Sequence, residues 1–174
     1  SNTTGELGLG FNNPFQMEVS VIYNQPPNII QFSCGFNHSL FLDVEGNVFS
    51  VGYNEMGNLG LGNNTDQNEL QKIPNIPPIQ AISASYSSYL LDFEGNIWNC
   101  GWNLNGQGHE DGNSNFDVPT KLTSISNIEQ IAFGTSGYHF LAKYLLWEAI
   151  LLDKLVLLLE IILMGGMPGI SVNS

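Results

Sequence analysis

Residues 41–62 read FLDVEGNVFSVGYNEMGNLGLG, and residues 90–111 read LLDFEGNIWNCGWNLNGQGHED. At an offset of 49 residues the two stretches place identical residues opposite each other: Gly46 and Gly95, Gly52 and Gly101, Asn54 and Asn103, Gly57 and Gly106. A fixed period of this length is the signature of an architecture built from one repeated supersecondary unit. This stretch therefore decides the fold class.

Further copies lie on both sides of it. QFSCGFNHSLFLD (31–43) aligns with QAISASYSSYLLD (80–92) at the same offset, which pairs Gly35 with Ala84. A third copy, QIAFGTSGYHFLAK, starts at Gln130, and NTTGELGLGFNN (2–13) matches residues 54–64 as the end of an earlier copy. In the third copy Gly137 falls at the position of His38 and His139 lies two places later, which indicates a small insertion or a degenerate strand.

Each copy predicts short strands. Residues 40–44 and 48–51 are apolar, β-favouring runs on either side of Glu45-Gly46-Asn47, and Gly and Asn both tolerate the positive φ of a tight hairpin. Phe49, Val51 and Tyr53 share one face of the outgoing strand, as do Trp98, Cys100 and Trp102 in the next copy, which indicates a half-buried strand. With no helical period before Lys143, the pattern predicts an all-β fold of propeller blades, each with four short antiparallel strands.

These residues resemble the regulator of chromosome condensation repeats, which form a seven-bladed β-propeller. The resemblance covers residues 2–143 and departs from the family at Gly108-His109, where Leu-Gly is expected, and at Ser87, which replaces a histidine. About three blades cannot close a ring of seven, so we expect a fragment of a larger protein, or a chain that pairs with another. The positions that carry the structural motif are Gly35, His38, Asp43, Gly46, Gly52, Asn54, Gly57, Leu59, Gly60, Asp92, Gly95, Trp98, Gly101, Asn103, Gly106, Gln107 and Gly134.

The C-terminal segment does not follow the repeat. Residues 144–164 are dominated by Leu and Ile, and three interpretations stand side by side. A transmembrane helix has the length but is interrupted by Glu148, Asp153, Lys154 and Glu160. A soluble helix has the composition but no clean polar face. The third interpretation, which we favour, is a frameshift product, because the repeat stops within a strand. The sequence thus divides into repeats at 1–143 (a partial blade at 1–30 and blades at about 31–92 and 93–143) and an apolar tail at 144–174, helical if ordered.

Candidate sites are few. Asp111, Asn113, Asn115 and Asp117 alternate as in a calcium loop, but Phe116 and Leu122 stand where an EF-hand needs Gly and Glu. A triad of His38, Ser39 and Asp43 lacks a nucleophile-elbow context. The Gly-x-Leu-Gly-x-Gly strings have no following Lys or helix for a phosphate. We therefore expect no catalytic, metal or cofactor-binding residue and no cofactor.

The net charge of the chain limits the classes of molecule that it is expected to bind. The chain has 16 acidic and 4 basic residues and a net charge of -12, which disfavours direct binding to nucleic acid and leaves a basic protein as a suitable partner. Cys34 and Cys100 have no metal-binding or redox spacing, which suggests reduced thiols in the cytoplasm or nucleus. The resemblance implies a non-enzymatic interaction or scaffold module whose partner is a protein, either a small GTPase or a ubiquitin-pathway component, and no membrane. The alternative that it implies is guanine-nucleotide exchange on a small Ran-like GTPase.

Overall fold

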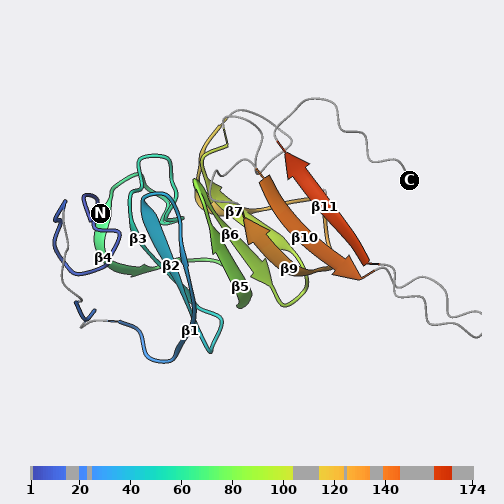
Figure 1. Cartoon of the computed structure of the whole chain (residues 1–174), viewed down its shortest axis with the longest axis horizontal. Coiled ribbons are helices and arrows are strands. Elements are labelled where there is room, and N and C mark those ends of the chain that lie inside the picture. Colours follow the sequence, from blue (N-terminus) through green and yellow to red (C-terminus); the bar gives the residue numbers. More distant parts are fainter. Residues whose placement is uncertain are drawn as a thin grey trace, which may run out of the picture.

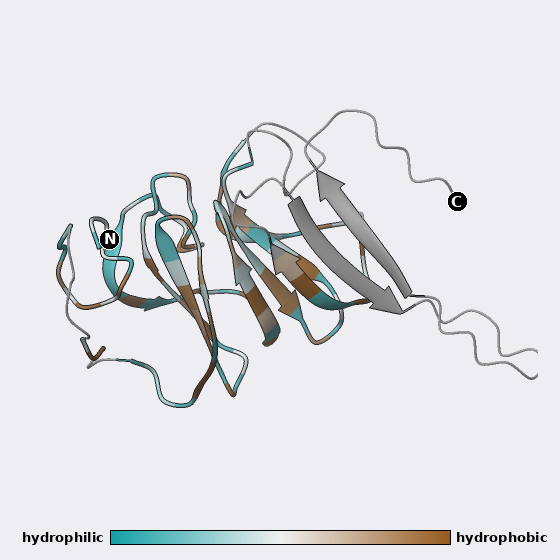
Figure 2. Cartoon of the chain, in the orientation of Figure 1, coloured by the Kyte–Doolittle hydropathy of each residue, from teal (hydrophilic) through white to brown (hydrophobic). Residues whose placement is uncertain are grey.

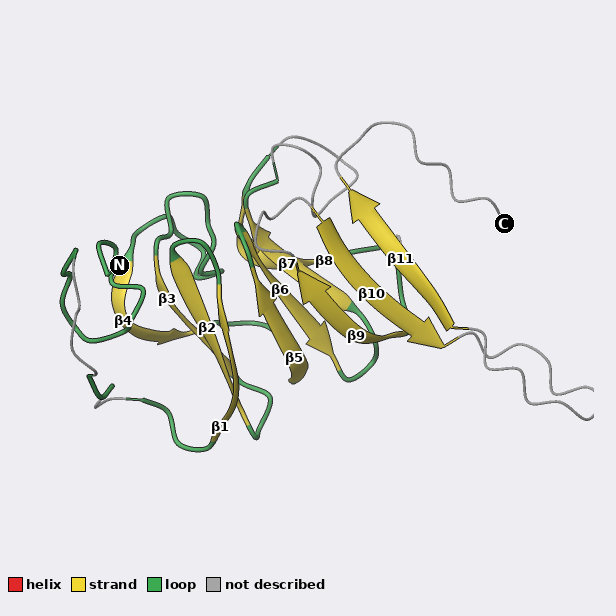
Figure 3. Ribbon diagram, viewed as in Figure 1, coloured by secondary structure: helices red, strands yellow, loops and turns green. Residues whose placement is uncertain are grey.

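The computed structural model describes residues 2–14, 20–22, 25–103, 114–123, 125–133, 139–145 and 159–165. All regular elements in these ranges are strands (Figure 3). They form two four-stranded antiparallel sheets, β1–β4 and β5–β8, and a three-stranded sheet of β9, β10 and β11. The expectation of four short antiparallel strands per unit is confirmed for the first two sheets.

The strands are five to seven residues long. The first sheet consists of β1 (Ile29–Cys34), β2 (His38–Asp43), β3 (Val48–Gly52) and β4 (Gln67–Lys72). The second consists of β5 (Ile79–Ala84), β6 (Ser87–Asp92), β7 (Ile97–Gly101) and β8 (Phe116–Lys121). The third consists of β9 (Ile128–Phe133), β10 (His139–Leu145) and β11 (Leu159–Gly165). No helix in the described ranges has the length and hydropathy needed to cross a bilayer.

The three sheets stand side by side, with the second between the other two (Figure 1). Two clusters of buried apolar side chains lie between the sheets, and Figure 2 colours the strands at the centre of the picture brown, the hydrophobic end of its scale. One core cluster joins Leu40 and Leu42 of β2 to Leu90 of β6, and the other joins Tyr89 and Leu91 of β6 to the third sheet. Because successive side chains of a strand point to opposite faces, β6 contributes to both clusters and is buried at every position.

The β2–β3 and β6–β7 hairpins are built alike. Asp92 Oδ1 accepts hydrogen bonds from the backbone N–H groups of Glu94 (2.9 Å) and Asn96 (2.8 Å), and Asp43 does the same in the first sheet. Gly95 has φ of 79°. Asn96 and its counterpart do not share this positive φ; each instead donates its side-chain amide to the aspartate. The hairpin tips therefore use positive φ at the glycine and a side-chain hydrogen bond at the asparagine.

The register of β1 and β5, the first strands of their sheets, corrects the repeat alignment. In the first sheet Cys34 of β1 faces Ser39 of β2, and in the second Ala84 of β5 faces Ser88 of β6. Ala84 is therefore the counterpart of Cys34, and Ser85 takes the place that sequence comparison assigned to Ala84. The β5–β6 turn is one residue shorter than the β1–β2 turn, so β1 and β5 are offset by 50 residues rather than 49.

The third sheet accounts for the displaced histidine. Phe133 of β9 faces Phe140 of β10, the same pairing as Cys34 with Ser39. His139 consequently occupies the register position of His38, and the β9–β10 turn carries the small insertion. By the same register, Tyr144, opposite Ile128, stands where Asp43 stands opposite Ile29.

The tail forms a strand where the structure describes it. Leu159–Gly165, β11, pairs with all of β10, so the expectation of a helix is wrong for these residues. The β10 edge offers a row of backbone hydrogen-bonding groups, and β-branched Ile161 and Ile162 suit a strand that pairs with it. Gly165 lies opposite His139, as Gly52 lies opposite His38. Tyr144 and Leu145 of the tail belong to β10. The other tail residues, which include three of the four charged residues that interrupt it, lie outside the described residues.

A loop from each unit closes onto the unit that follows. We call residues 54–62 the interlock loop; its counterpart at residues 2–10 packs on the first sheet. Ser88 of β6 donates its hydroxyl proton to Asn58 O (2.6 Å), and Ser39 of β2 donates to Glu6 O (2.8 Å). A Cβ on Gly57 would lie 2.5 Å from Phe116 O of β8, so the loop approaches the second sheet closely enough to require glycine.

Within each loop one buried asparagine holds the chain. Asn54 Oδ1 accepts from the Leu59 N–H (2.9 Å), and Asn54 Nδ2 donates to Asn63 O (2.8 Å). Asn2 makes the equivalent bonds to Leu7 and Phe11 at 2.9 and 2.8 Å. The N-terminal segment thus has the local structure of an interlock loop, as its sequence match to residues 54–64 predicts.

Candidate functional site

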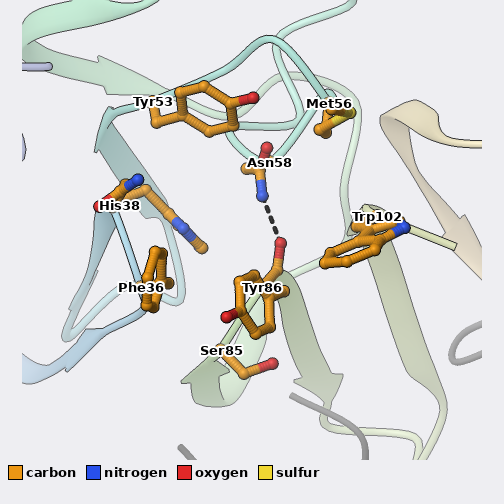
Figure 4. Close-up of a pocket in the computed structure, with 9 residues that line it drawn as sticks. Phe36, His38, Tyr53, Met56, Asn58, Ser85, Tyr86 and Trp102 are labelled. Carbon is orange, nitrogen blue, oxygen red and sulfur yellow. Dashed lines mark hydrogen bonds between the residues drawn. The ribbon is translucent and has the colours of Figure 1, made fainter. Parts of the chain in front are cut away.

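A hollow lies where the first and second sheets meet, at the ends of the strands that are opposite to the two hairpins. We call it the seam pocket. It has a volume of about 250 Å³, and its walls come from the β1–β2 turn, the interlock loop, the β5–β6 turn and the residue after β7 (Figure 4). The side chains used below are Phe36, His38, Tyr53, Asn58, Tyr86 and Trp102.

Aromatic rings dominate the wall. Phe36 stacks on Tyr86 with 4.9 Å between ring centroids, and Tyr86 meets Trp102 edge to face at 5.1 Å. Both geometries are favourable for aromatic pairs. Phe36 is 64% exposed, and Tyr53, Tyr86 and Trp102 are partly exposed. A row of aromatic side chains across two sheets is thus held in fixed geometry and remains accessible from solvent.

Hydrogen bonds across the seam position this wall. His38 lies fully inside, and its Nε2 is 2.9 Å from the hydroxyl oxygen of Ser88 in the next sheet. Asn58 Nδ2 donates to Tyr86 O, as the dashed line in Figure 4 shows. The Phe36 N–H donates to Ser85 O (2.8 Å). Burial lowers the pKa of His38 to about 4, so this imidazole is neutral at physiological pH.

Three residues of the wall have buried polar atoms without a hydrogen-bond partner. They are Asn58 Oδ1, Ser85 Oγ and Trp102 Nε1, and a fourth such atom, Asn99 Oδ1, belongs to a residue outside the wall. Figure 4 shows the indole nitrogen at the end of Trp102 that points away from Tyr86. Buried polar groups without partners are uncommon, so their grouping marks the seam as a place where packing is incomplete.

The rim of the pocket is acidic. Tyr53 donates its phenol proton to Glu55 Oε2 (3.2 Å), and Asp66 Oδ1 accepts from the Asn54 N–H (2.7 Å). Partial burial, followed by the hydrogen bond and charge of Glu55 and the charge of Asp66, raises the pKa of Tyr53. The phenol of Tyr53 therefore stays protonated and neutral at physiological pH.

The residues of the predicted motif lie in two groups. Asp43, Gly46, Asp92, Gly95 and Trp98 lie at the hairpin end of the sheets, with Trp98 Nε1 donating to Asp92 Oδ2 (2.9 Å). Gly35, His38, Gly52, Asn54, Gly57, Leu59, Gly60, Gly101 and Asn103 lie at the seam end or in the interlock loop. Gly106, Gln107 and Gly134 fall outside the described residues.

The alternative sites do not assemble among the residues described. His38 contacts Ser88, whereas Ser39 bonds to Glu6 O and Asp43 lies at the far end of β2, so the triad is not formed. Asn115 Oδ1 accepts from the Asn103 N–H (3.2 Å). Asp111 and Asn113 of the calcium-loop hypothesis lie outside the described residues, and no group of three or more metal-ligating His, Cys, Asp or Glu occurs in the described ranges.

Sequence reasoning missed the aromatic wall. The sequence places Trp102 on the same face as Trp98, but Phe36 and Tyr86 belong to no motif and are not among the predicted positions. A usable signal is present in the sequence. Phe36 lies two residues after the end of β1, and Tyr86 lies two residues after the end of β5. The two rings stack on each other. Detecting it required the offset of 50 that only the strand register reveals.

Family models of the regulator of chromosome condensation repeat match residues 29–58 and 45–90. Residues 29–90 are regulator of chromosome condensation repeats. The models cover the whole first sheet and the second as far as Leu90 in β6, including both sides of the seam pocket. The resemblance recognised from the glycine pattern is thereby confirmed for about 60 residues.

Curated relatives carry the same repeats. The X-linked retinitis pigmentosa GTPase regulator of Homo sapiens is 36% identical over 73 residues, which are 42% of this chain and 7% of the relative. The human protein RCC2 is 40% identical over 65 residues, 37% of this chain and 12% of the relative. The regulator of chromosome condensation of Xenopus laevis is 38% identical over 65 residues and is matched over 15% of its length. The match thus spans less than a sixth of each relative.

Solved structures show the same fold. Human WBSCR16 superposes with a TM-score of 0.71 at 20% identity, over 83% of this chain and 38% of that protein. Prp20p of Saccharomyces cerevisiae, whose structure was described with its binding to Gsp1p and histones, superposes with a TM-score of 0.62 at 27% identity, over 82% of this chain and 37% of that protein. These neighbours are propellers of the regulator of chromosome condensation type, so the first two sheets are propeller blades.

Proposed function

We propose that this chain is a non-enzymatic protein-interaction module, formed by the repeats at residues 1–143, that binds a protein partner in the cytoplasm or nucleus. The observation that carries the proposal is the seam pocket, where partly exposed aromatic side chains are held in fixed positions on a rigid two-blade support. Aromatic residues in such positions are enriched among those that dominate binding energy at protein interfaces.

The partner classes follow from the relatives. One relative is named a GTPase regulator, and Prp20p was described with its binding to a protein, Gsp1p, and to histones. We therefore propose a small GTPase as the first partner to test. A ubiquitin-pathway component, which only the resemblance to the repeat family implies, is the second. Nucleic acid is disfavoured as a direct partner because the net charge of -12 repels phosphate.

The test is direct binding. The full chain is immobilised, and purified Ran-like GTPases and ubiquitin-pathway proteins are passed over it in an optical biosensor. We expect at least one to bind and Trp102→Ala to weaken binding about thirtyfold or more, since truncation of an interface hot spot costs at least about 2 kcal/mol. Phe93→Ala is the matched control because Phe93 is 68% exposed at the opposite, hairpin end. Binding that survives Trp102→Ala unchanged contradicts the role of the seam pocket.

The second candidate, guanine-nucleotide exchange on a small Ran-like GTPase, is supported by the relative named as a GTPase regulator. It is separated from simple binding by one measurement. Release of a fluorescent guanine nucleotide from each GTPase is followed with and without an excess of the full chain. Accelerated release identifies exchange, whereas binding without acceleration identifies a scaffold.

A further inference from the structure

The seam pocket is a small hollow that can admit a long side chain. Its volume of about 250 Å³ lies below the roughly 300–1,000 Å³ of pockets that hold small-molecule ligands or cofactors. Four of its wall residues are aromatic: Phe36, Tyr53, Tyr86 and Trp102. The face of an aromatic ring carries negative electrostatic potential and attracts cations at about 6 Å or less from its centre. A pocket with several such rings favours a cationic side chain over a neutral one of equal volume.

The positions of the charged side chains also favour a cationic side chain in the seam pocket. Among the described residues the lysines are Lys72 at the end of β4, Lys121 at the end of β8 and Lys143 in β10, and all three lie toward the hairpin end of their sheets. The seam end carries Glu55 and Asp66 beside Tyr53, and Asp117 follows the first residue of β8. The described part of the chain thus has no basic side chain at the end that bears the pocket.

We propose that the seam pocket receives a lysine or arginine side chain from a basic segment of the protein partner. The alkyl part of that side chain packs against Phe36 and Tyr86, and its charged group lies near the Glu55 carboxylate at the rim. This inference rests on the proposed interaction function and specifies the chemistry of the partner. An uncharged apolar side chain would fit the volume but would place the acidic rim against a surface that offers it no compensating charge.

The proposal is tested on the full chain by NMR of the tryptophan indole groups. The probe is a short glycine–serine peptide with two lysines, and the matched probe is the same peptide with both lysines acetylated. We expect the lysine peptide to shift the Trp102 indole signal and leave that of Trp98, which lies at the hairpin end and donates to Asp92, in place. Equal shifts with the acetylated peptide, or no shift with either, overturn the proposal.

Three variants distinguish the contribution of charge and aromatic contact at the pocket from a general effect on folding. Glu55 is exposed, so Glu55→Gln leaves the fold intact and should weaken the lysine peptide about threefold, in the range of exposed ion pairs. Trp102→Ala should weaken it about tenfold, which corresponds to a strong cation–π contact. Phe93→Ala should leave it unchanged. Equal weakening by Trp102→Ala and Phe93→Ala contradicts a site at the seam.

Different experimental outcomes refute the interaction function and the cation-binding pocket. A protein partner that binds the full chain while the lysine peptide leaves the Trp102 signal unmoved refutes the cation pocket and leaves the interaction function standing. A lysine peptide that binds at Trp102, with no protein partner retained by the full chain, refutes the interaction function and leaves the chemistry of the pocket standing.

Discussion

At the scale of single residues, the aspartates at the hairpins each accept several hydrogen bonds. Asp92 accepts from two backbone N–H groups, from the Asn96 amide and from the Trp98 indole, and Asp43 accepts three of these four. Burial alone raises the pKa of Asp92, but the hydrogen bonds from Trp98, Asn96 and Glu94 outweigh it, so the pKa lies below its usual value.

Asp92→Asn is expected to destabilise the protein by about 2–3 kcal/mol, because an uncharged amide replaces a carboxylate that accepts several charge-assisted bonds. The free energy of unfolding in urea measures it. Glu94→Gln, at an exposed neighbour in the same turn, is the control and should change stability by less than about 0.5 kcal/mol. Because the folded pKa of Asp92 is depressed, its contribution is complete above about pH 4 and is lost as the pH falls through the folded value. An Asp92→Asn variant as stable as the unaltered protein at pH 7 contradicts this role.

His38 gives a second acid-sensitive window at higher pH. Its folded pKa of about 4 lies below the value of about 6.5 in an unfolded chain, so the unfolded state binds the extra proton between these values. Stability should fall as pH decreases from 6.5 to 4 and be about 2 kcal/mol lower at pH 5 than at pH 8. His38→Gln should remove most of that difference, whatever it does to stability at pH 8. Urea unfolding at both pH values decides it, and an unchanged difference in the variant assigns the effect to another group.

At the residue scale the sequence predicts which residues belong to the repeat better than it predicts the hydrogen-bond partners of those residues. Asp43 and Asp92 were recognisable as repeat positions, but their hydrogen bonds to the asparagine after the tip depend on turn geometry that the letters do not show. Trp98 was expected in a blade core, and it does pack against the first core cluster. Its bond to Asp92 has no counterpart in the first sheet, where Phe49 stands and cannot donate, so comparison of the copies could not reveal it.

At the scale of elements, the interlock loop depends on close approach to the following sheet. Gly57 has φ of 81°, and a Cβ there would lie 2.5 Å from Phe116 O and 2.6 Å from Asp117 Cα. Gly62 in the same loop has φ of 74° but would place its Cβ no closer than 3.7 Å to Val118 Cγ1. The two glycines therefore separate the backbone requirement from the steric one.

Gly57→Ala is expected to cost about 2–4 kcal/mol, because the strained backbone and the clash with β8 add, whereas Gly62→Ala should cost about 1 kcal/mol from the backbone alone. Chemical denaturation of both variants gives the comparison. Equal effects of the two substitutions would show that contact between the loop and β8 contributes nothing beyond backbone strain.

Strands and hairpins were largely predictable, because alternation of apolar residues and glycine at the tips are local signals. Their register was not. The one-residue shortening of the β5–β6 turn moves β5 relative to β1, and nothing in QAISASYSSYLLD distinguishes a shift at Ala84 from one at Ser85. The strand at Leu159–Gly165 escaped prediction for a related reason: a Leu-rich run fits helix and strand alike until the free edge of β10 is present to pair with it.

At the scale of the whole molecule, the sequence predicted repetition and charge but not where charge lies. We propose that the acidic side chains near the seam, away from the lysines of the described residues, attract a basic partner to a chain of net charge -12. Association with such a partner should therefore slow about tenfold between 50 and 300 mM salt, while its dissociation rate changes much less. Stopped-flow or biosensor rates measure both. A salt-independent association rate contradicts electrostatic steering.

The interlock loops also bear on the order in which the units can fold during translation. Residues 54–62 are complete before Ser88 and Phe116, the groups on which they close, have left the ribosome. The bonds that shape the loop, from Asn54 to Leu59 and Asn63, span only five and nine residues and are available at once. We infer that each unit can form its interlock loop before the following unit is made, which favours assembly of the units in the order in which they are translated.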